Sequence, residues 1–269
     1  MSDFFLFPLG LAIAAYAVMV GTGGGFLLVP ILVQLYSEPP AVITSISLSV
    51  TFLGSLSGVF AYARQRRVDY LTSGLLSMGA FPGAALGAFL TRHVPRELFS
   101  ATFGVLLLLL AAFLLRPDAE RVKGEGLFDI LYRRIADNHG AVYEYRYNPF
   151  LAVLLALVTS ATATLFGIGG GVLFVPLAVR WLRIPPHVAV ATTSLVVAVS
   201  SGTGVLVHAT EGHIQANWDR ILFLALGAVL GAQIGARLAG RISERALLRA
   251  LAVGLIFLGV RLLWTAVRA

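Results

Sequence analysis

The chain contains no cysteine, a single lysine and few charged residues of any kind. Without cysteine it has no disulfide, thiolate nucleophile or cysteine-ligated metal. Because 12% of its 269 residues are charged, 58% are hydrophobic and the mean hydropathy is +0.88, a soluble fold cannot bury its apolar surface. We therefore expect an all-α polytopic membrane protein whose first partner is the lipid bilayer.

Carboxylates are missing from the interior of every long apolar run. All thirteen acidic residues lie in loops or at the ends of such runs. Cation carriers and proton relays usually place a carboxylate in mid-membrane, so an anionic or neutral substrate is expected. The formal charge of +7 comes from short loops between apolar runs, which indicates topology signals and no nucleic-acid partner. Residues 4–20 lack a basic flank, so a cleaved signal peptide is not expected.

A glycine-rich decapeptide occurs twice, each time between apolar stretches. GTGGGFLLVP at 21–30 returns as GIGGGVLFVP at 167–176, and Pro-Pro-x-Val follows both copies at the same offset. Each copy of this longer unit contains five apolar runs. The sequence thus predicts two homologous transmembrane repeats, at 1–116 and 149–269, joined by a polar cytoplasmic loop at 117–148.

The second apolar run of each repeat, at 24–37 and 170–182, is shorter than the about 17 residues needed to cross a bilayer. If all ten runs cross the membrane, fifteen of the twenty basic residues lie on one side and five on the other. If the first and second runs of each repeat together cross only once, the basic residues divide into twelve and eight. Basic residues favour the cytoplasmic side. This favours five crossings per repeat, and hence two inverted repeats in the inner (plasma) membrane, each with a glycine-broken helix.

The duplicated glycine loops are the predicted substrate site. A helix that begins near Phe26 or Val172 presents unpaired N–H groups and its positive dipole end to the loop, which suits an anion. Close helix packing is the competing interpretation of glycine in membranes. It is the preferred one for the glycines spaced by four, which are Gly79, Gly83, Gly87, Gly227, Gly231 and Gly235.

Hydroxyl residues crowd the third run of both repeats, including Thr44, Ser45, Ser47, Ser49 and Thr51 in the first. About half of such hydroxyls bond their own or a neighbouring helix, and the others line a polar path. The complete predicted substrate site is Gly21, Thr22, Gly23, Gly24, Gly25, Phe26, Ser47, Gly167, Gly169, Gly170, Gly171, Val172, Thr193 and Ser194.

Four further residues are candidates for gating or for proton or anion contact. His208 could carry a proton, and Arg180, aligned with Gln34, could attract an anion. The preferred interpretation is an interfacial His208 and an Arg180 side chain that extends to the membrane surface. Gln233 is an embedded amide that could instead bond a neighbouring helix. Neither a cofactor nor a metal is expected.

The paired Gly-x-Gly-Gly-Gly-x-Leu-x-Val-Pro motifs, followed by Pro-Pro-x-Val and a Thr/Ser-rich run, resemble the TauE/SafE (TSUP) family of sulfite exporters. The resemblance implies a secondary transporter that exports sulfite, sulfoacetate or a related sulfonate by alternating access between the two halves. The glycine motif of the family corresponds here to the glycines of both motifs. The copies differ at Thr22 and Ile168, so the site need not be symmetric.

Several alternatives remain open at this level. A passive anion channel could use the same glycine loops as a filter, and a carrier could move another small organic anion. An intramembrane hydrolase would need Ser194 and His208 in contact, but fourteen residues of helix separate them by about 21 Å. We therefore expect no enzyme. An oligomer is possible and is left undetermined.

Overall fold

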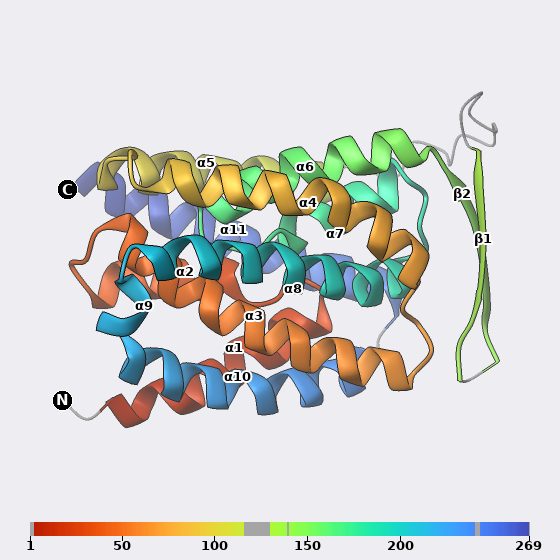
Figure 1. Ribbon diagram of the computed structural model, residues 1–269, viewed down its shortest axis with the longest axis horizontal. Helices are drawn as coiled ribbons and strands as arrows, with labels where there is room; N and C mark the ends of the chain where they lie inside the picture. The colour runs from red at the N-terminus through yellow and green to blue at the C-terminus, as the bar shows by residue number, and fades with distance from the viewer. Residues whose placement is uncertain (1–2, 116–129, 139, 240–242, 269) are drawn as a thin grey trace.

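The computed structural model describes residues 3–115, 130–138, 140–239 and 243–268, and its helices run along one common axis (Figure 1). The first half comprises α1 (Leu6–Met19), α2 (Gly25–Leu35), α3 (Pro40–Arg64), α4 (Tyr70–Thr91) and α5 (Arg96–Leu115). The second half comprises α6 (Pro149–Leu165), α7 (Gly171–Arg180), α8 (Pro186–Thr210), α9 (His213–Ala216), α10 (Trp218–Ala239) and α11 (Glu244–Arg268).

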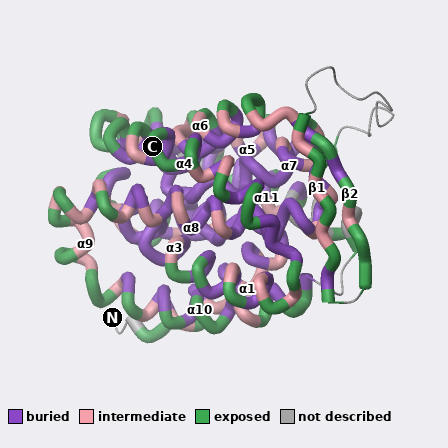
Figure 2. The backbone as a smooth tube through the Cα atoms, turned by 45° about the vertical axis from the view of Figure 1, so that its right-hand side comes forward, coloured by how far each residue is buried: buried purple, intermediate pink, exposed green. Residues whose placement is uncertain are grey.

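The two halves are interlocked rather than side by side. Helix α1 packs along α10 and α4 along α6, while α3 packs on α8 and α5 on α11. Figure 2 shows buried residues concentrated on α3 and α8, the central pair. Any Cβ on Gly83 would overlap the carbonyl oxygen of Leu157 in α6, and one on Gly231 would overlap that of Leu11 in α1. This confirms that the glycines spaced by four serve close helix packing.

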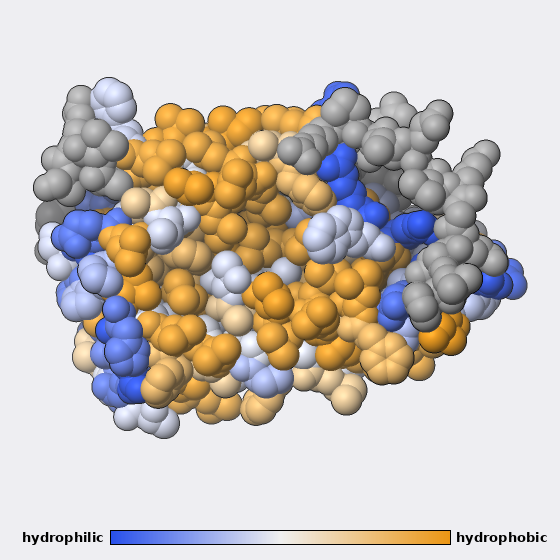
Figure 3. Space-filling view, turned by 90° about the horizontal axis from the view of Figure 1, so that it is seen from above, coloured by the Kyte–Doolittle hydropathy of each residue, from blue (hydrophilic) through white to orange (hydrophobic). Residues whose placement is uncertain are grey.

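Large hydrophobic side chains are exposed on α3, α4, α5, α6, α8, α10 and α11, and on the face in Figure 3 they form an apolar belt between two polar ends. Five described helical segments are long and apolar enough to cross a membrane: α3, α4, Arg96–Phe113 of α5, α8 and α10. The chain is therefore a multi-pass helical membrane protein, with the membrane normal along the helix axes.

Helices α1 and α2 form a hairpin that enters and leaves the protein at one end. The ring of Phe4, just before α1, lies 5.6 Å from that of Phe223 near the start of α10. Glu38, just after α2, places its Oε1 3.4 Å from Nη1 of Arg220, also at the start of α10. Both ends of the hairpin therefore lie at the end of the molecule that carries the chain termini (Figure 1).

The α6–α7 hairpin behaves in the same way at the opposite end. Tyr147, just before α6, bonds Thr72 at the start of α4, and the Trp181 ring after α7 lies 6.4 Å from Phe113 at the end of α5. The expectation that all ten apolar runs cross the membrane is therefore wrong. At about 1.5 Å per residue, the 11 residues of α2 and the 10 of α7 span about 15–16 Å, which returns them only from mid-depth.

Residues 130–147 hold a β-hairpin, so the expectation of an all-α chain with a plain polar loop is wrong here. Strands β1 (Leu131–Ala136) and β2 (Val142–Tyr147) pair antiparallel, with Leu131 opposite Tyr147. Their alternating side chains let one face turn inward, and Tyr145 and Tyr147 are buried against the helix ends. The hairpin stands across one end of the bundle (Figure 1).

A buried carboxylate fastens this hairpin to the bundle. Asp69 is fully buried and caps the start of α4. Arg133 of β1 donates two hydrogen bonds of 2.7 Å to its two oxygens, and the Tyr145 hydroxyl donates one of 2.6 Å. Burial alone would raise the pKa of the Asp69 carboxyl, but its bonds from Arg133, Tyr145 and Thr72 hold it below the ordinary value. Asp69 therefore stays ionised and keeps the hairpin docked at neutral pH.

Candidate functional site

Each membrane hairpin reverses through a turn that requires glycine. Between α1 and α2, the φ angles of Gly21, Gly23 and Gly24 are 79°, 80° and 104°. The corresponding angles in the second turn, at Gly167, Gly169 and Gly170, are 73°, 74° and 103°. Glycine adopts these left-handed values without the steric cost that other residues meet. The duplicated motif is thus the signature of two matching reversals, both buried.

The two turns cross each other in the interior, side by side and in opposite directions. A Cβ on Gly25 would lie 2.6 Å from the Gly167 carbonyl oxygen, and one on Gly171 would overlap the carbonyl oxygen of Gly21. The two backbones are therefore as close as glycine permits. The structure brings the predicted glycines of both repeats into one place.

Two of the predicted hydroxyls hold these turns from the opposite half of the chain. Ser47 of α3 donates a 2.7 Å hydrogen bond to the Gly167 carbonyl, and Thr193 of α8 lies 3.5 Å from the Gly21 carbonyl and 3.2 Å from that of Val190. Thr22 donates to Ala17, and Ser194 to Val190. The protons of these four hydroxyls are engaged by carbonyl groups, which shapes the turns.

Among the described residues, two hydroxyls of α3 at the crossing have no hydrogen-bond partner, and that of Thr164 at the end of α6 has none either. Thr51 and Ser55, one turn apart in α3, are each 1% exposed, and neither Thr51 Oγ1 nor Ser55 Oγ has a hydrogen bond. A Cβ on Gly23 would lie 2.7 Å from Ser55 Oγ, and one on Gly169 would lie 2.7 Å from Thr51 Cγ2. Buried helical hydroxyls normally bond a carbonyl one turn back, so Thr51 and Ser55 are candidates for contact with a ligand.

The sequence contained a signal for these two residues. Ser47, Thr51 and Ser55 recur every four residues, which places all three on one face of α3. The predicted site includes Ser47 from this face and contains neither Thr51 nor Ser55. Only the position of the turns distinguishes a hydroxyl that holds the backbone from one that is free.

Backbone N–H groups complete the crossing. In the first turn, the N–H groups of Gly21 and Thr22 donate to backbone carbonyls, and the next N–H group that does so is that of Leu27. Within the described chain, the N–H groups between these, at 23–26, have no acceptor. The second turn leaves the corresponding N–H groups at 169–172 without one. Since α2 and α7 begin here, the positive ends of two helix dipoles add to these donors.

The four residues expected to gate or to contact protons or anions lie away from the crossing. Gln233 donates to the Ser57 carbonyl and hydroxyl at 2.7 and 2.8 Å, and Arg180 donates to the Phe113 carbonyl at the end of α5. Gln34 is exposed near the end of α2. His208 lies 3.4 Å from Thr44 Oγ1, and Thr44 in turn abuts Gly167.

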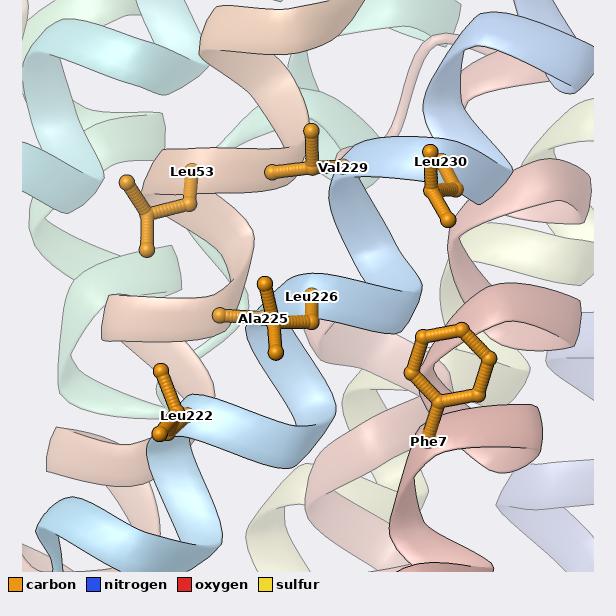
Figure 4. A pocket seen from close by; sticks show the side chains of 7 residues that line it. All are labelled: Phe7, Leu53, Leu222, Ala225, Leu226, Val229 and Leu230. Atoms are coloured by element: carbon orange, nitrogen blue, oxygen red, sulfur yellow. The ribbon is translucent and has the colours of Figure 1, made fainter.

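A separate groove of about 320 Å³ lies between α1, α3 and α10 on the apolar belt. Its walls are the apolar side chains of Phe7, Leu53, Leu222, Ala225, Leu226, Val229 and Leu230 (Figure 4). Because none of these side chains donates a hydrogen bond, the groove does not suit an anion.

Comparison with known proteins agrees with this architecture. The profile of the family described as sulfite exporter TauE/SafE matches residues 6–262. A probable membrane transporter protein, YunE of Bacillus subtilis, is 33% identical over 240 residues, covering 85% of both chains. The probable membrane transporter protein MJ0441 of Methanocaldococcus jannaschii is 26% identical over 222 residues, covering 78% of this chain and 74% of its own. No solved structure matches.

Proposed function

Because the chain belongs to the sulfite exporter TauE/SafE family and is a membrane transporter, we propose that it exports a small sulfur-containing oxyanion, such as sulfite or sulfoacetate. The observation that carries the proposal is the crossing of the two glycine turns. Unpaired N–H groups from both halves and the free hydroxyls of Thr51 and Ser55 gather there. The described side chains nearest the turn glycines are Thr, Ser, Val, Ile and Ala, and none of these neighbours is a carboxylate that would repel an anion.

The binding mode follows from the donors. Oxyanion oxygens would accept hydrogen bonds from N–H groups near Phe26 and Val172, which begin α2 and α7. Thr51 and Ser55 would donate from α3. The backbone of each turn is held by the other half through Ser47 and Thr193. Relative movement of the halves would therefore open the crossing toward one end at a time, which is alternating access.

The helix pairing supports an inverted repeat. The contact of α1 with α10 has its counterpart in that of α4 with α6, and α3 and α8 face each other. We propose three crossings and one hairpin per repeat, with the β-hairpin end in the cytoplasm and the protein in the plasma membrane. An inside-negative potential would then assist export by about 2.3 kcal/mol per charge at 100 mV.

The proposed substrate is tested with the purified protein in liposomes. We expect saturable flux of radiolabelled sulfite that sulfoacetate and thiosulfate reduce and chloride does not, with the rate following an imposed potential. Counterflow would distinguish a carrier from a passive channel, which shows none. Absence of flux for every sulfur anion, with flux for another organic anion, would overturn the substrate assignment.

Alanine at Gly24 or Gly170 is expected to abolish transport with little loss of folded protein. A Cβ has room at both places, with its nearest neighbours at 3.6 and 3.4 Å, but φ near 104° costs an alanine about 1–2 kcal/mol. The turn must shift to relieve this strain, which displaces the N–H groups that follow. Flux and size-exclusion profiles of the two variants measure both effects.

Gly74→Ala in α4 is the matched control, because a Cβ there meets nothing within 4 Å. It should transport as the wild type does. Unaltered flux in both Gly24→Ala and Gly170→Ala would remove the glycine turns from the substrate site.

A further inference from the structure

Two histidines and a glutamate converge where α8 ends, at the opposite end of the protein from the β-hairpin. His208 lies in the last turn of α8, Glu211 follows it, and Gly212, with φ of 80°, turns the chain into His213 at the start of α9. As a result, Glu211 Oε2 lies 3.3 Å from Nδ1 of His208 and 3.3 Å from Nδ1 of His213. One carboxylate oxygen thus faces two imidazole nitrogens.

A threonine of α3 lies behind His208 and favours one arrangement of its ring proton. Thr44 Oγ1 donates its only proton to the Ala41 carbonyl at 3.1 Å, so toward His208 it can only accept. His208 Nε2, at 3.4 Å, can therefore donate to this hydroxyl. With the ring proton on Nε2, Nδ1 would offer its lone pair on the side of Glu211 Oε2, where a cation could accept it.

The other two groups also have atoms placed to bind a cation at this point. Within the part of the chain that the structure describes, His213 Nδ1 is buried and has no hydrogen-bond partner. The second oxygen of Glu211, Oε1, lies 3.7 Å from Nη1 of Arg92, which leaves Oε2 for the imidazoles. A single divalent ion between the three side chains would accept both nitrogen lone pairs and the carboxylate together.

We infer that His208, Glu211 and His213 form a binding site for a divalent transition-metal ion of the zinc type. Nitrogen and oxygen ligands at about 2.0–2.1 Å in a tetrahedron lie about 3.3 Å apart, the separation that both Glu211–His pairs already have. One ligating atom of each residue lies within 4.8 Å of the others. Two imidazoles and one carboxylate select zinc, cobalt or nickel over magnesium or calcium, which prefer oxygen ligands.

An entry path and a structural consequence belong to this site. His213 lies in the wall of a cavity of about 470 Å³ that Glu38, Asn217 and Asp219 also line. An ion entering there would fasten α9 to the end of α8. Through His208 the same ion would tie Thr44 of α3, which abuts Gly167 in the second glycine turn.

Cobalt(II) binding to the full-length protein without a histidine tag tests this inference. We expect one Co²⁺ per chain with micromolar affinity, the visible absorption bands of a tetrahedral ion, and displacement by Zn²⁺. His213→Ala and Glu211→Gln should each weaken binding by about 10-fold or more, since each removes one of three ligands. His93→Ala, which removes an exposed histidine at the same end of the protein, should bind as the wild type does.

Two results would contradict the metal site. No stoichiometric Co²⁺ binding, or equal binding by His213→Ala, would overturn the site, the latter because it would show adventitious binding to surface groups. The His213 side chain is 28% exposed, so its alanine variant should fold, and Glu211→Gln provides an independent second variant. Sulfite flux measured in the presence of a chelator tests the transport proposal separately.

Discussion

Thr51→Val is expected to raise the KM for the transported anion about tenfold or more while leaving the free energy of unfolding unchanged or slightly higher. Valine keeps the shape of threonine but removes a buried hydroxyl that has no partner in the protein. A hydrogen bond to a charged ligand contributes about 1.5–3 kcal/mol, which corresponds to about 10- to 150-fold in binding. Removing an unsatisfied buried hydroxyl costs the fold nothing.

Ser47→Ala, one turn earlier on the same face of α3, is the control, because it should lower the free energy of unfolding where Thr51→Val does not. It leaves the buried Gly167 carbonyl without its 2.7 Å bond, which should cost about 1–3 kcal/mol of stability. Thermal unfolding in detergent and flux in liposomes measure the two variants. A destabilised Thr51→Val, or one with the wild-type KM, would show that Thr51 does not contact the substrate.

Asp69→Asn is expected to release the β-hairpin from the bundle while the membrane helices stay folded. The amide cannot accept both hydrogen bonds of Arg133 and that of Tyr145, and its NH₂ group would face a guanidinium. Breaking such a buried pair costs about 3 kcal/mol, more than a small hairpin can supply by itself. Limited proteolysis with trypsin should then cut after Arg133 and Arg134, which the docked wild type protects.

Glu144→Gln is the matched control on the same hairpin, because the Glu144–Arg134 pair is exposed and contributes little. Acid provides a second readout. The folded pKa of Asp69 lies below its unfolded value, so its stabilisation is complete above the unfolded pKa and is lost as pH falls through the folded pKa. In that window the hairpin of the wild type should become sensitive to a protease that is active in acid, such as pepsin. An Asp69→Asn protein as resistant as the wild type would contradict the docking role.

The sequence predicted the features that depend on local spacing. The duplicated glycines predicted two equivalent helix breaks, and the glycines spaced by four predicted close helix contacts. The charge count rejected a single crossing by each pair of short runs. The charge count could not distinguish a pair of runs that crosses the membrane twice from a hairpin that enters and returns. Both arrangements leave every later loop on the same side of the membrane.

What the sequence did not reveal depends on contacts between distant segments. Ser47, Thr51 and Ser55 look alike along α3, and only the course of the Gly167 turn, more than a hundred residues later, occupies the first and leaves the others free. The β-hairpin was missed because its alternation is short and lies in a polar segment. Its stability comes from Asp69, a residue that in the sequence looks like an ordinary helix cap.

The interlocked pairing of the halves has a consequence for how the protein is made. Helix α1 finds its packing partner, α10, only after about 200 more residues have left the ribosome. At roughly 5–20 residues per second, this leaves the first hairpin waiting for about 10–40 s. Throughout that interval its glycine turn and the unpaired N–H groups that follow it lack the second half that encloses them. The nascent first half therefore needs shelter from lipid at the insertion site until synthesis of the second half is nearly complete.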